Sequence, residues 1–276
     1  MATREKIVID QSNLRYVTPK KVLEAHLLNK PDKVITRISP SQLGKCHRAH
    51  FFKIKQIERT IRNTPSELAN FELGFIWEQI IKQALDEQGV KYSYQDKFVD
   101  IELNMEGSSD FIIGDPTQEA YMYDPKTMAS KWFWYLEAKK KKGQYDPKTE
   151  HYSYFIQQGA YLLMAKRRGW HIHNSQLVFI SKDDSIIGAE VDIQLTPALE
   201  KEVLKRINDL NNYLERDILP PCTCDGWLVG YCDYGNPNTM KPNSKGRMSA
   251  TECCPDEEEL EVWRAEAQEV QNASTK

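Results

Sequence analysis

The chain has none of the long apolar segments that mark a membrane-spanning or exported protein. Its 276 residues contain no run of 18 apolar residues, so no segment is expected to cross a bilayer. The first ten residues, MATREKIVID, also lack the apolar core of a signal peptide. These absences favour a cytoplasmic protein without a membrane partner.

The chain also lacks the excess of positive charge that usually accompanies nucleic-acid binding. Its 37 Lys and Arg residues face 40 Asp and Glu residues, which gives a formal net charge of −3. The charge is uneven, because Lys139 to Lys142 form a basic run and residues 255–261, PDEEELE, form an acidic one. A basic groove can coexist with an acidic tail, so the net charge does not exclude a nucleic-acid partner.

The stretch that organises the chain is residues 107–127, GSSDFIIGDPTQEAYMYDPKT. We interpret it as a hairpin, because two strand-like segments flank the turn residues 114–117. Side chains alternate along a strand, so Asp124 and Lys126 share one face. If the strands pair, Asp110 on the first strand lies near Asp124 on the second. The hairpin therefore predicts two carboxylates and one ammonium group at one end of a small sheet.

Such a cluster suits metal-assisted hydrolysis of a phosphodiester bond. Two close carboxylates repel one another unless a cation lies between them. Hard oxygen ligands favour Mg²⁺ or Mn²⁺, and the bound ion makes its water more acidic. The lysine can orient this water and counter the negative charge that develops during the reaction.

The motifs GSSD and DPKT, at the two ends of this stretch, resemble those of the PD-(D/E)XK nuclease superfamily, specifically its RecB-like exonuclease branch. The resemblance implies an α/β fold with a restriction-endonuclease-like mixed central sheet flanked by helices. It also implies that Asp110, Asp124 and the peptide carbonyl of Pro125 bind the metal ion, and that Lys126 orients the attacking water. Without the resemblance, the same residues would make an ordinary hairpin with surface charges.

Two other acid-x-Lys sequences compete with the DPKT motif. The sequence EAK at 137–139 begins 27 residues after Asp110, against 14 for Asp124, and its segment favours a helix. A second DPKT, at 146–149, follows no strand, and we interpret it as a loop. The first DPKT therefore remains the candidate. Because Pro125 has no backbone N–H, its strand should be an edge or lack a partner at that point.

A helix is predicted from Thr64 to about Gln88, because TPSE at its start is a capping box and Gly89 follows its end. Its apolar stripe consists of Leu68, Phe71, Phe75, Ile76, Ile80 and Leu85. In the resembling family a Gly-x-x-x-(His/Glu) element on this helix points into the metal site, and Gly74 and Glu78 match its glutamate version. Many iron–sulfur members carry histidine there, and a glutamate on a helix is usually solvated.

A further helix is predicted from His151 to Arg168, where Gln157 and Tyr161 are four residues apart and so share a face. Their place after the DPKT motif matches the Gln-x-x-x-Tyr pair of the resembling family. The resemblance implies that they position DNA and the active site. A glutamine and a tyrosine at this spacing are also common by chance.

The remaining patterns complete an α/β sandwich. Further strands are predicted at 91–103, 175–181 and 186–195. A helix follows that starts at Thr196 and Pro197, has an apolar stripe at Leu199, Val203, Ile207, Leu210 and Leu214, and ends at Pro220 and Pro221. Residues 130–144 combine Trp132, Trp134 and Tyr135 with the lysine run. These aromatic side chains either stack on a nucleic-acid strand or form a core-facing patch beside solvated lysines.

Six cysteines are unevenly spread, with Cys46 early and five within residues 222–254. In a reducing cytoplasm, clustered cysteines more often bind metal than form disulfides. Cys46 lies in an amphipathic segment that starts at Ser39 and Pro40, where a buried structural cysteine is the plain interpretation. The segment also resembles the Ser-x-Leu-x-x-Cys helix of RecB-like nucleases, whose iron–sulfur members use that cysteine as a cluster ligand.

One early cysteine and three late ones match the layout of this iron–sulfur branch, in which the cluster is structural. The predicted ligands are Cys46, Cys224, Cys232 and Cys253, with Cys222 and Cys254 as alternates. The close Cys-x-x-Cys pair of the family is absent. Four thiolates suit a [4Fe–4S] cluster or Zn²⁺, and zinc could also use His47 or His50.

These patterns divide the chain into an N-terminal lead-in (1–37), a nuclease core (38–221), a cysteine-rich metal-binding segment packed on the first core helix (222–254) and an acidic tail (255–276). The resemblance implies a metal-dependent DNA nuclease, an exonuclease that hydrolyses single-stranded DNA or duplex ends. It would act in recombination, repair or phage DNA metabolism, in the cytoplasm of a bacterial or phage-infected cell. The alternative is a non-cleaving DNA- or protein-binding module of a recombination or replication assembly.

Overall fold

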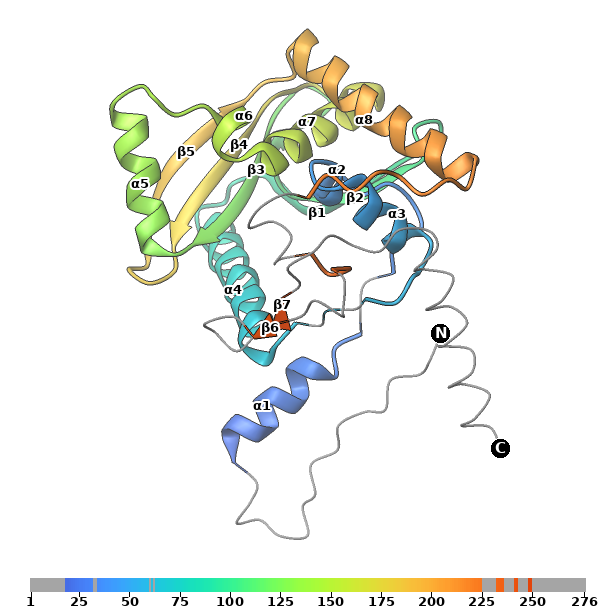
Figure 1. The fold of residues 1–276 in the computed structure, drawn as a ribbon. Helices are drawn as coiled ribbons and strands as arrows, with labels where there is room; N and C mark the ends of the chain where they lie inside the picture. Colours follow the sequence, from blue (N-terminus) through green and yellow to red (C-terminus); the bar gives the residue numbers. More distant parts are fainter. Residues whose placement is uncertain are drawn as a thin grey trace.

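The computed structural model describes residues 18–31, 34–59, 61, 63–224, 232–235, 241–242 and 248–249. Its centre is a five-stranded sheet with the strand order β1-β2-β3-β4-β5 (Figure 1). The strands are β1 (Tyr92–Asp100), β2 (Met105–Asp115), β3 (Glu119–Met128), β4 (Ile172–Ser181) and β5 (Ile186–Ile193). Neighbouring strands run antiparallel except β3 and β4, which are parallel. The sheet is therefore mixed, as the sequence predicted.

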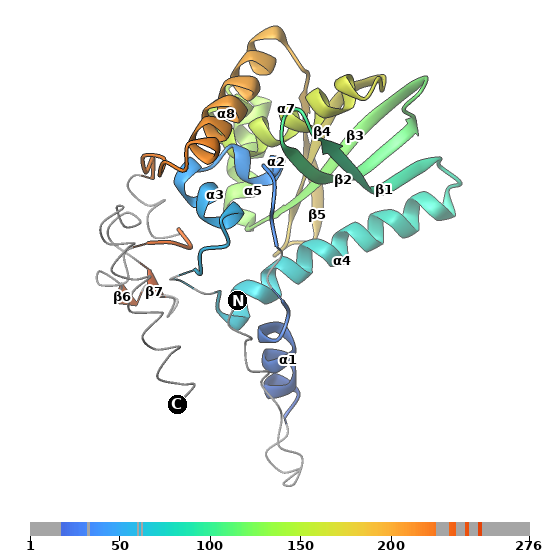
Figure 2. The same cartoon turned by 90° about the vertical axis from the view of Figure 1, so that its right-hand side faces the viewer.

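Helices lie on both sides of this sheet. Their bounds are α1 (Pro19–Leu28), α2 (Pro40–Leu43), α3 (His47–Ile54), α4 (Pro65–Glu87), α5 (Ser130–Lys141), α6 (Pro147–Glu150), α7 (Tyr152–Arg167) and α8 (Pro197–Glu215). The two views place α7 and α8 on one side of the sheet and α4 on the other (Figures 1 and 2). The predicted α/β class is confirmed. A separate pair of short strands, β6 (Lys241–Pro242) and β7 (Met248–Ser249), lies outside the sheet.

The core is built between the sheet and α7, and α8 covers α7. Residues 156–165 of α7 are buried without interruption, so this helix is enclosed on all sides. The stripe of α8 is buried as predicted, through Leu199, Val203, Ile207 and Leu210. Within the described parts of the chain, no helix is long and apolar enough to span a membrane.

Helix α4 has the opposite character, because none of its 23 residues is buried. It begins as predicted, with the Glu67 carboxylate accepting a hydrogen bond from the Thr64 N–H at 2.9 Å. Four of the six residues of its apolar stripe are exposed, with Phe71 at 63% and Ile76 at 51%. An apolar stripe usually indicates a buried face, but among the described residues α4 packs chiefly against β3 and α1, and no further layer covers it.

The two competing acid-x-Lys sequences lie outside the sheet. Glu137 and Lys139 are part of α5, which confirms the helix expected there. The prediction of a loop at 146–149 is wrong, because these residues form the helical turn α6 and its cap. The Asp146 carboxylate accepts hydrogen bonds from the Lys148 N–H at 3.1 Å and from Thr149 Oγ1 at 2.6 Å, and these bonds stabilise the turn.

Candidate active site

The two aspartates of the hairpin lie where β2 and β3 separate. The strands pair from Asp115↔Glu119 to Phe111↔Tyr123, and continuing this register would set Asp110 opposite Asp124. The pairing stops before that point, at Tyr123, two residues before Pro125. On its other side, β3 continues to pair with β4. The proline therefore lies in an interior strand that lacks a partner on its β2 side, which is one of the two situations expected for it.

We call the place where β2 and β3 separate, between Asp110 and Asp124, the fork. The glycine of the GSSD motif allows neighbouring helices to approach it closely. A Cβ atom at Gly107 would lie 2.8 Å from Pro40 Cδ and 2.9 Å from the Tyr161 hydroxyl oxygen. That hydroxyl donates a 2.6 Å hydrogen bond to the Ser108 carbonyl oxygen. The small residue thus lets α2 and α7 pack on the strand that carries Asp110.

Asp124 is held by donors on both of its oxygens and is only 3% exposed. Lys126 Nζ donates to Oδ1 at 2.5 Å, and Gln157 Nε2 donates to Oδ2 at 3.3 Å. Gln158 Nε2 also donates to Oδ2. Ser175 Oγ in turn donates to Gln158 Oε1 at 2.5 Å. The carboxylate is therefore fixed by a chain of buried polar groups.

The charges at the fork are strongly coupled. Burial raises the pKa of Asp110 far above its usual range, and the hydrogen bond and charge of Asp124 raise it further. Burial alone would lower the pKa of Lys126, but the charges of Asp124 and Asp110 outweigh it, and the lysine pKa is raised. One ammonium group thus lies close to two carboxylates. A divalent cation can balance the second negative charge, and the oxygen donors suit Mg²⁺ or Mn²⁺.

Glu78 of α4 approaches the same fork from the other side of the sheet. It is half-buried, and its Oε2 accepts a 2.9 Å hydrogen bond from the Tyr94 hydroxyl on β1. Burial raises the pKa of Glu78, while the Tyr94 hydrogen bond and the charge of Lys126 lower it. One turn earlier, Gly74 brings α4 close to β3, since a Cβ there would meet Thr127 Oγ1 at 3.9 Å. The structure thus brings Glu78 towards the aspartates rather than into open solvent.

The polar groups of Gln157 and Tyr161 contact the protein itself. Both side chains are buried, with the Gln157 amide on Asp124 and the Tyr161 hydroxyl on the Ser108 carbonyl. This geometry positions the two strands of the fork. A direct contact of either residue with DNA stays a prediction.

Sequence reasoning missed Gln158, Ser175 and Tyr94. Gln158 and Ser175 are fully buried, and their side chains hydrogen-bond to each other. A buried glutamine beside Gln157 and a serine within an apolar strand were the available signals. Helical spacing could not show that two adjacent glutamines reach the same carboxylate oxygen.

Four cysteines gather at the junction of α2, α3 and the segment after α8. The Sγ atoms of Cys46, Cys222 and Cys224 lie within 4.8 Å of one another, and the Cys224 thiol also interacts with that of Cys232. The Thr223 N–H donates to Cys46 Sγ at 3.5 Å. The structure therefore joins three predicted ligands with Cys222, which was predicted only as an alternate. The other two candidates, Cys253 and Cys254, lie outside the described residues.

This donor set suits a metal centre without a histidine. Four thiolates are the usual ligands of a [4Fe–4S] cluster or of structural Zn²⁺. The buried His50 accepts a hydrogen bond from the Ser39 N–H at 3.0 Å, and burial lowers its pKa to about 3. Among the described residues, the group of potential metal ligands at this place contains neither His47 nor His50.

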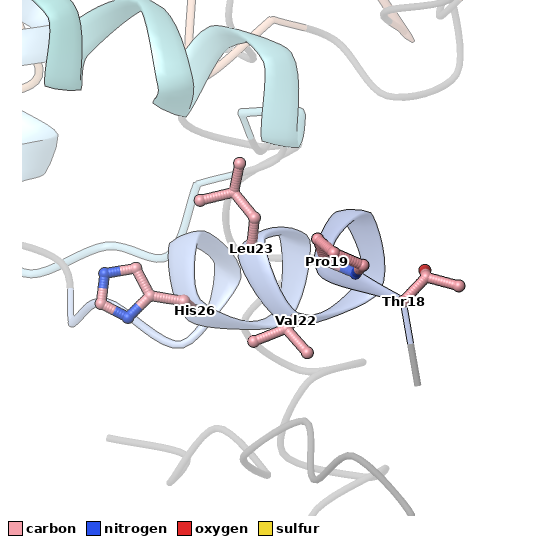
Figure 3. A pocket seen from close by; sticks show the side chains of 5 residues that line it. All are labelled: Thr18, Pro19, Val22, Leu23 and His26. Atoms are coloured by element: carbon pink, nitrogen blue, oxygen red, sulfur yellow. The ribbon is translucent and has the colours of Figure 1, made fainter. Parts of the chain in front are cut away.

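The exposed aromatic residues of α5 resolve an alternative left open by the sequence. Trp132, Trp134 and Tyr135 face solvent, while Phe133 and Leu136 of the same helix are buried. A core-facing patch of the three is therefore excluded. The open depression on α1 in Figure 3, lined by Thr18, Pro19, Val22, Leu23 and His26, shares no residue with the fork.

No model of a known protein family matches this sequence, and no curated protein sequence matches it. Among solved structures, the chain is similar to SSO0001, with a TM-score of 0.46 and 18% identity over 77% of this chain and 89% of that one. It is also similar to the alkaline exonuclease LHK-Exo from Laribacter hongkongensis, with a TM-score of 0.47 and 13% identity over 71% of this chain and 93% of that one. The structure of LHK-Exo in complex with dAMP gives a TM-score of 0.46 and 16% identity over 66% and 89% of the two chains. These similarities concern the arrangement of the backbone alone.

Proposed function

We propose that the protein is a metal-dependent DNA nuclease of the PD-(D/E)XK superfamily, in its RecB-like branch, and that it acts as an exonuclease on single strands or duplex ends. The observation that carries the proposal is the fork itself. Two carboxylates, the partly buried Asp110 and the buried Asp124, meet one ammonium group, Lys126, at the point where two paired strands part.

Each residue at the fork would have a separate role in phosphodiester hydrolysis. Asp110, Asp124, Glu78 and the Pro125 carbonyl would hold Mg²⁺ or Mn²⁺, which supplies a Lewis acid for the phosphate and a more acidic water. Lys126, placed 2.5 Å from Asp124 Oδ1, would orient the attacking water and counter the charge that develops on the phosphate. Gln157 and Gln158 fix Asp124, and Tyr161 fixes the strand of Asp110.

The cysteine group would have a structural role. We assign its ligands as Cys46, Cys222, Cys224 and Cys232, with a [4Fe–4S] cluster as the expected occupant and Zn²⁺ as the alternative. The expected partner is DNA, and recombination or replication proteins are possible further partners. The expected location is the cytoplasm of a bacterial or phage-infected cell, with a role in recombination, repair or phage DNA metabolism.

End-labelled single-stranded and duplex DNA test this function with Mg²⁺, with Mn²⁺ and with EDTA. Wild-type protein is expected to shorten the labelled strands only with a metal ion. Asp110→Asn and Lys126→Met should each lower the rate by a factor of about 100 or more, because each removes a group that acts on the reacting atoms. A wild-type protein that binds DNA but never cleaves it with either metal ion would favour the non-cleaving binding module instead.

A further inference from the structure

One face of α4 changes its surroundings halfway along the helix. At about 100° per residue, Phe71, Phe75, Glu78 and Gln79 all project within an arc of about 100° around the helix axis. In the C-terminal half the face meets β1, where Glu78 Oε2 and Gln79 Nε2 contact the Tyr94 hydroxyl at 2.9 and 3.1 Å. In the N-terminal half the same face carries exposed rings, with Phe71 63% and Phe75 48% exposed.

These two phenylalanines lie beside the strand end that carries the candidate catalytic residues. Gly74 stands next to Phe75, and a Cβ on it would meet Thr127 Oγ1 at 3.9 Å. Thr127 directly follows Lys126 on β3. The aromatic rings therefore flank the approach to the fork from the side of Glu78.

A second set of exposed aromatic side chains begins just after the same strand. Helix α5 starts at Ser130, and its Trp132 is 58% exposed with Lys131 Nζ 5.5 Å from the centre of its ring. On the other helix, Lys182 Nζ donates to Asn70 Oδ1 at 2.9 Å, which sets a positive charge on the residue before Phe71 in the chain. Exposed rings with lysines beside them thus lie on two helices around the end of β3.

We propose that this surface, made of Phe71, Phe75 and Trp132, binds single-stranded DNA by stacking with its bases and leads the strand to the fork. The inference rests on the proposed nuclease function and specifies its substrate. Rings beside lysines are what binding of single strands requires, since every base has a face that can stack and every nucleotide carries a phosphate. In a duplex the bases already stack on one another and offer no free face, so a duplex would not use these rings.

The same helix supplies a matched control. Ile76 and Ile80 are 51% and 48% exposed, as open as Phe75, but they project from the face of α4 opposite Glu78. A helical protein partner that covered α4 as an apolar surface would use these isoleucines. A DNA strand that runs to the fork would not touch them.

The experiment measures the Kd of a fluorescent single-stranded 20-mer, and of the blunt duplex of the same sequence, by anisotropy. All variants carry Asp110→Asn, so that cleavage does not interfere. Phe71→Ala and Phe75→Ala should each weaken single-strand binding by about fivefold or more and leave duplex binding within about twofold. Ile76→Ala and Ile80→Ala should change neither Kd, and thermal unfolding should be the same for all four.

Two results overturn the inference. One is single-strand binding that is unchanged in both phenylalanine variants, and the other is an equal loss in the isoleucine variants. The nuclease assay with Asp110 intact separates this failure from that of the function. Metal-dependent cleavage together with an unchanged Kd for Phe75→Ala would contradict the stacking surface but not the nuclease function. If the phenylalanine variants weaken single-strand binding but the wild-type protein never cleaves DNA, the nuclease function is contradicted and the surface belongs to a binding module.

Discussion

Gln158 donates a hydrogen bond from its amide to Asp124 Oδ2, while its carbonyl oxygen accepts one from Ser175 Oγ at 2.5 Å. The glutamine, which is completely buried, therefore links the candidate metal ligand to β4. At 0% exposure, its side chain is out of reach of bulk solvent. Its neighbour Gln157 reaches the same oxygen at the longer distance of 3.3 Å.

We predict that Gln158→Leu lowers metal affinity and activity more than Gln157→Leu does. Removing the Gln158 amide leaves the Ser175 hydroxyl without its partner and lets Asp124 turn, whereas Gln157→Leu removes only the longer bond. The expected loss for Gln158→Leu is about 1–3 kcal/mol in unfolding free energy, with at least tenfold weaker Mn²⁺ binding. Urea denaturation and titration calorimetry with Mn²⁺ measure the two effects. Equal affinities in the two variants would contradict a special role for Gln158.

Gly107 provides a steric test of the fork. Gly107→Ala should destabilise the protein by about 1–3 kcal/mol, because its Cβ would press on Pro40 and on the Tyr161 hydroxyl. Adding Tyr161→Phe removes one of the two contacts, so the double variant should lose less than the sum of the single changes. Gly74→Ala is the control, since its Cβ has no neighbour closer than 3.9 Å and alanine favours a helix. Urea unfolding of the four variants measures these changes in the free energy of unfolding. Strictly additive changes for Gly107→Ala and Tyr161→Phe would contradict the close approach.

The stability of the metal-free protein should depend on pH through Asp110. Its pKa is raised in the folded state by burial and by Asp124, so above pH of about 4 the folded protein holds a proton that the unfolded chain has released. The free energy of unfolding must then fall as the pH rises through this range. The half-buried His47 and the buried His50, with pKa values lowered to about 4 and about 3, act in the opposite direction between those values and about 6.5.

Subtracting the curve of Asp110→Asn from that of the wild type removes the histidine contribution. In EDTA, the difference between wild type and variant should decline steadily from about pH 5 to pH 8, as measured by urea unfolding at each pH. A flat difference would show that Asp110 is ionised in the folded protein. With saturating Mg²⁺ or Mn²⁺ the decline should disappear, because the ion takes the place of the proton.

The cysteine group predicts a coloured, metal-containing protein. Anaerobic purification should give about four irons per chain and a broad absorption band near roughly 400 nm. Cys222→Ser should lose the metal, since its Sγ lies within 4.8 Å of those of Cys46 and Cys224. Cys253→Ser should keep it. The opposite pattern would restore Cys253 as the fourth ligand, and one zinc in a colourless protein would replace the cluster by Zn²⁺.

The sequence was most informative for features that depend on residues close together in the chain. Turn residues between two strand-like segments predicted the hairpin, and alternation along β3 placed Asp124 and Lys126 on one face, where they now share a hydrogen bond. The capping box at Thr64 and the buried stripe of α8 were equally local signals. Each depends on residues only a few positions apart, which is the range over which a sequence pattern can be interpreted without a fold.

The features that were missed depend on contacts between distant segments. The partners of Gln158 lie 34 and 17 residues away, on β3 and β4, and the choice of Cys222 depends on where the chain after α8 meets α3. The exposure of Phe71 and Phe75 also depends on distant segments of the chain. Periodicity shows that a helix has an apolar face, but only the packing of the whole chain shows whether that face is covered.

The cysteine group also changes how the chain is connected. Cys46 and Cys222 are 176 residues apart (222 − 46), and the whole sheet lies between them. With a metal ion bound by both, this length of chain is a closed ring. If a protease cut the chain once in the turn between β4 and β5, the two fragments would then stay joined through the metal.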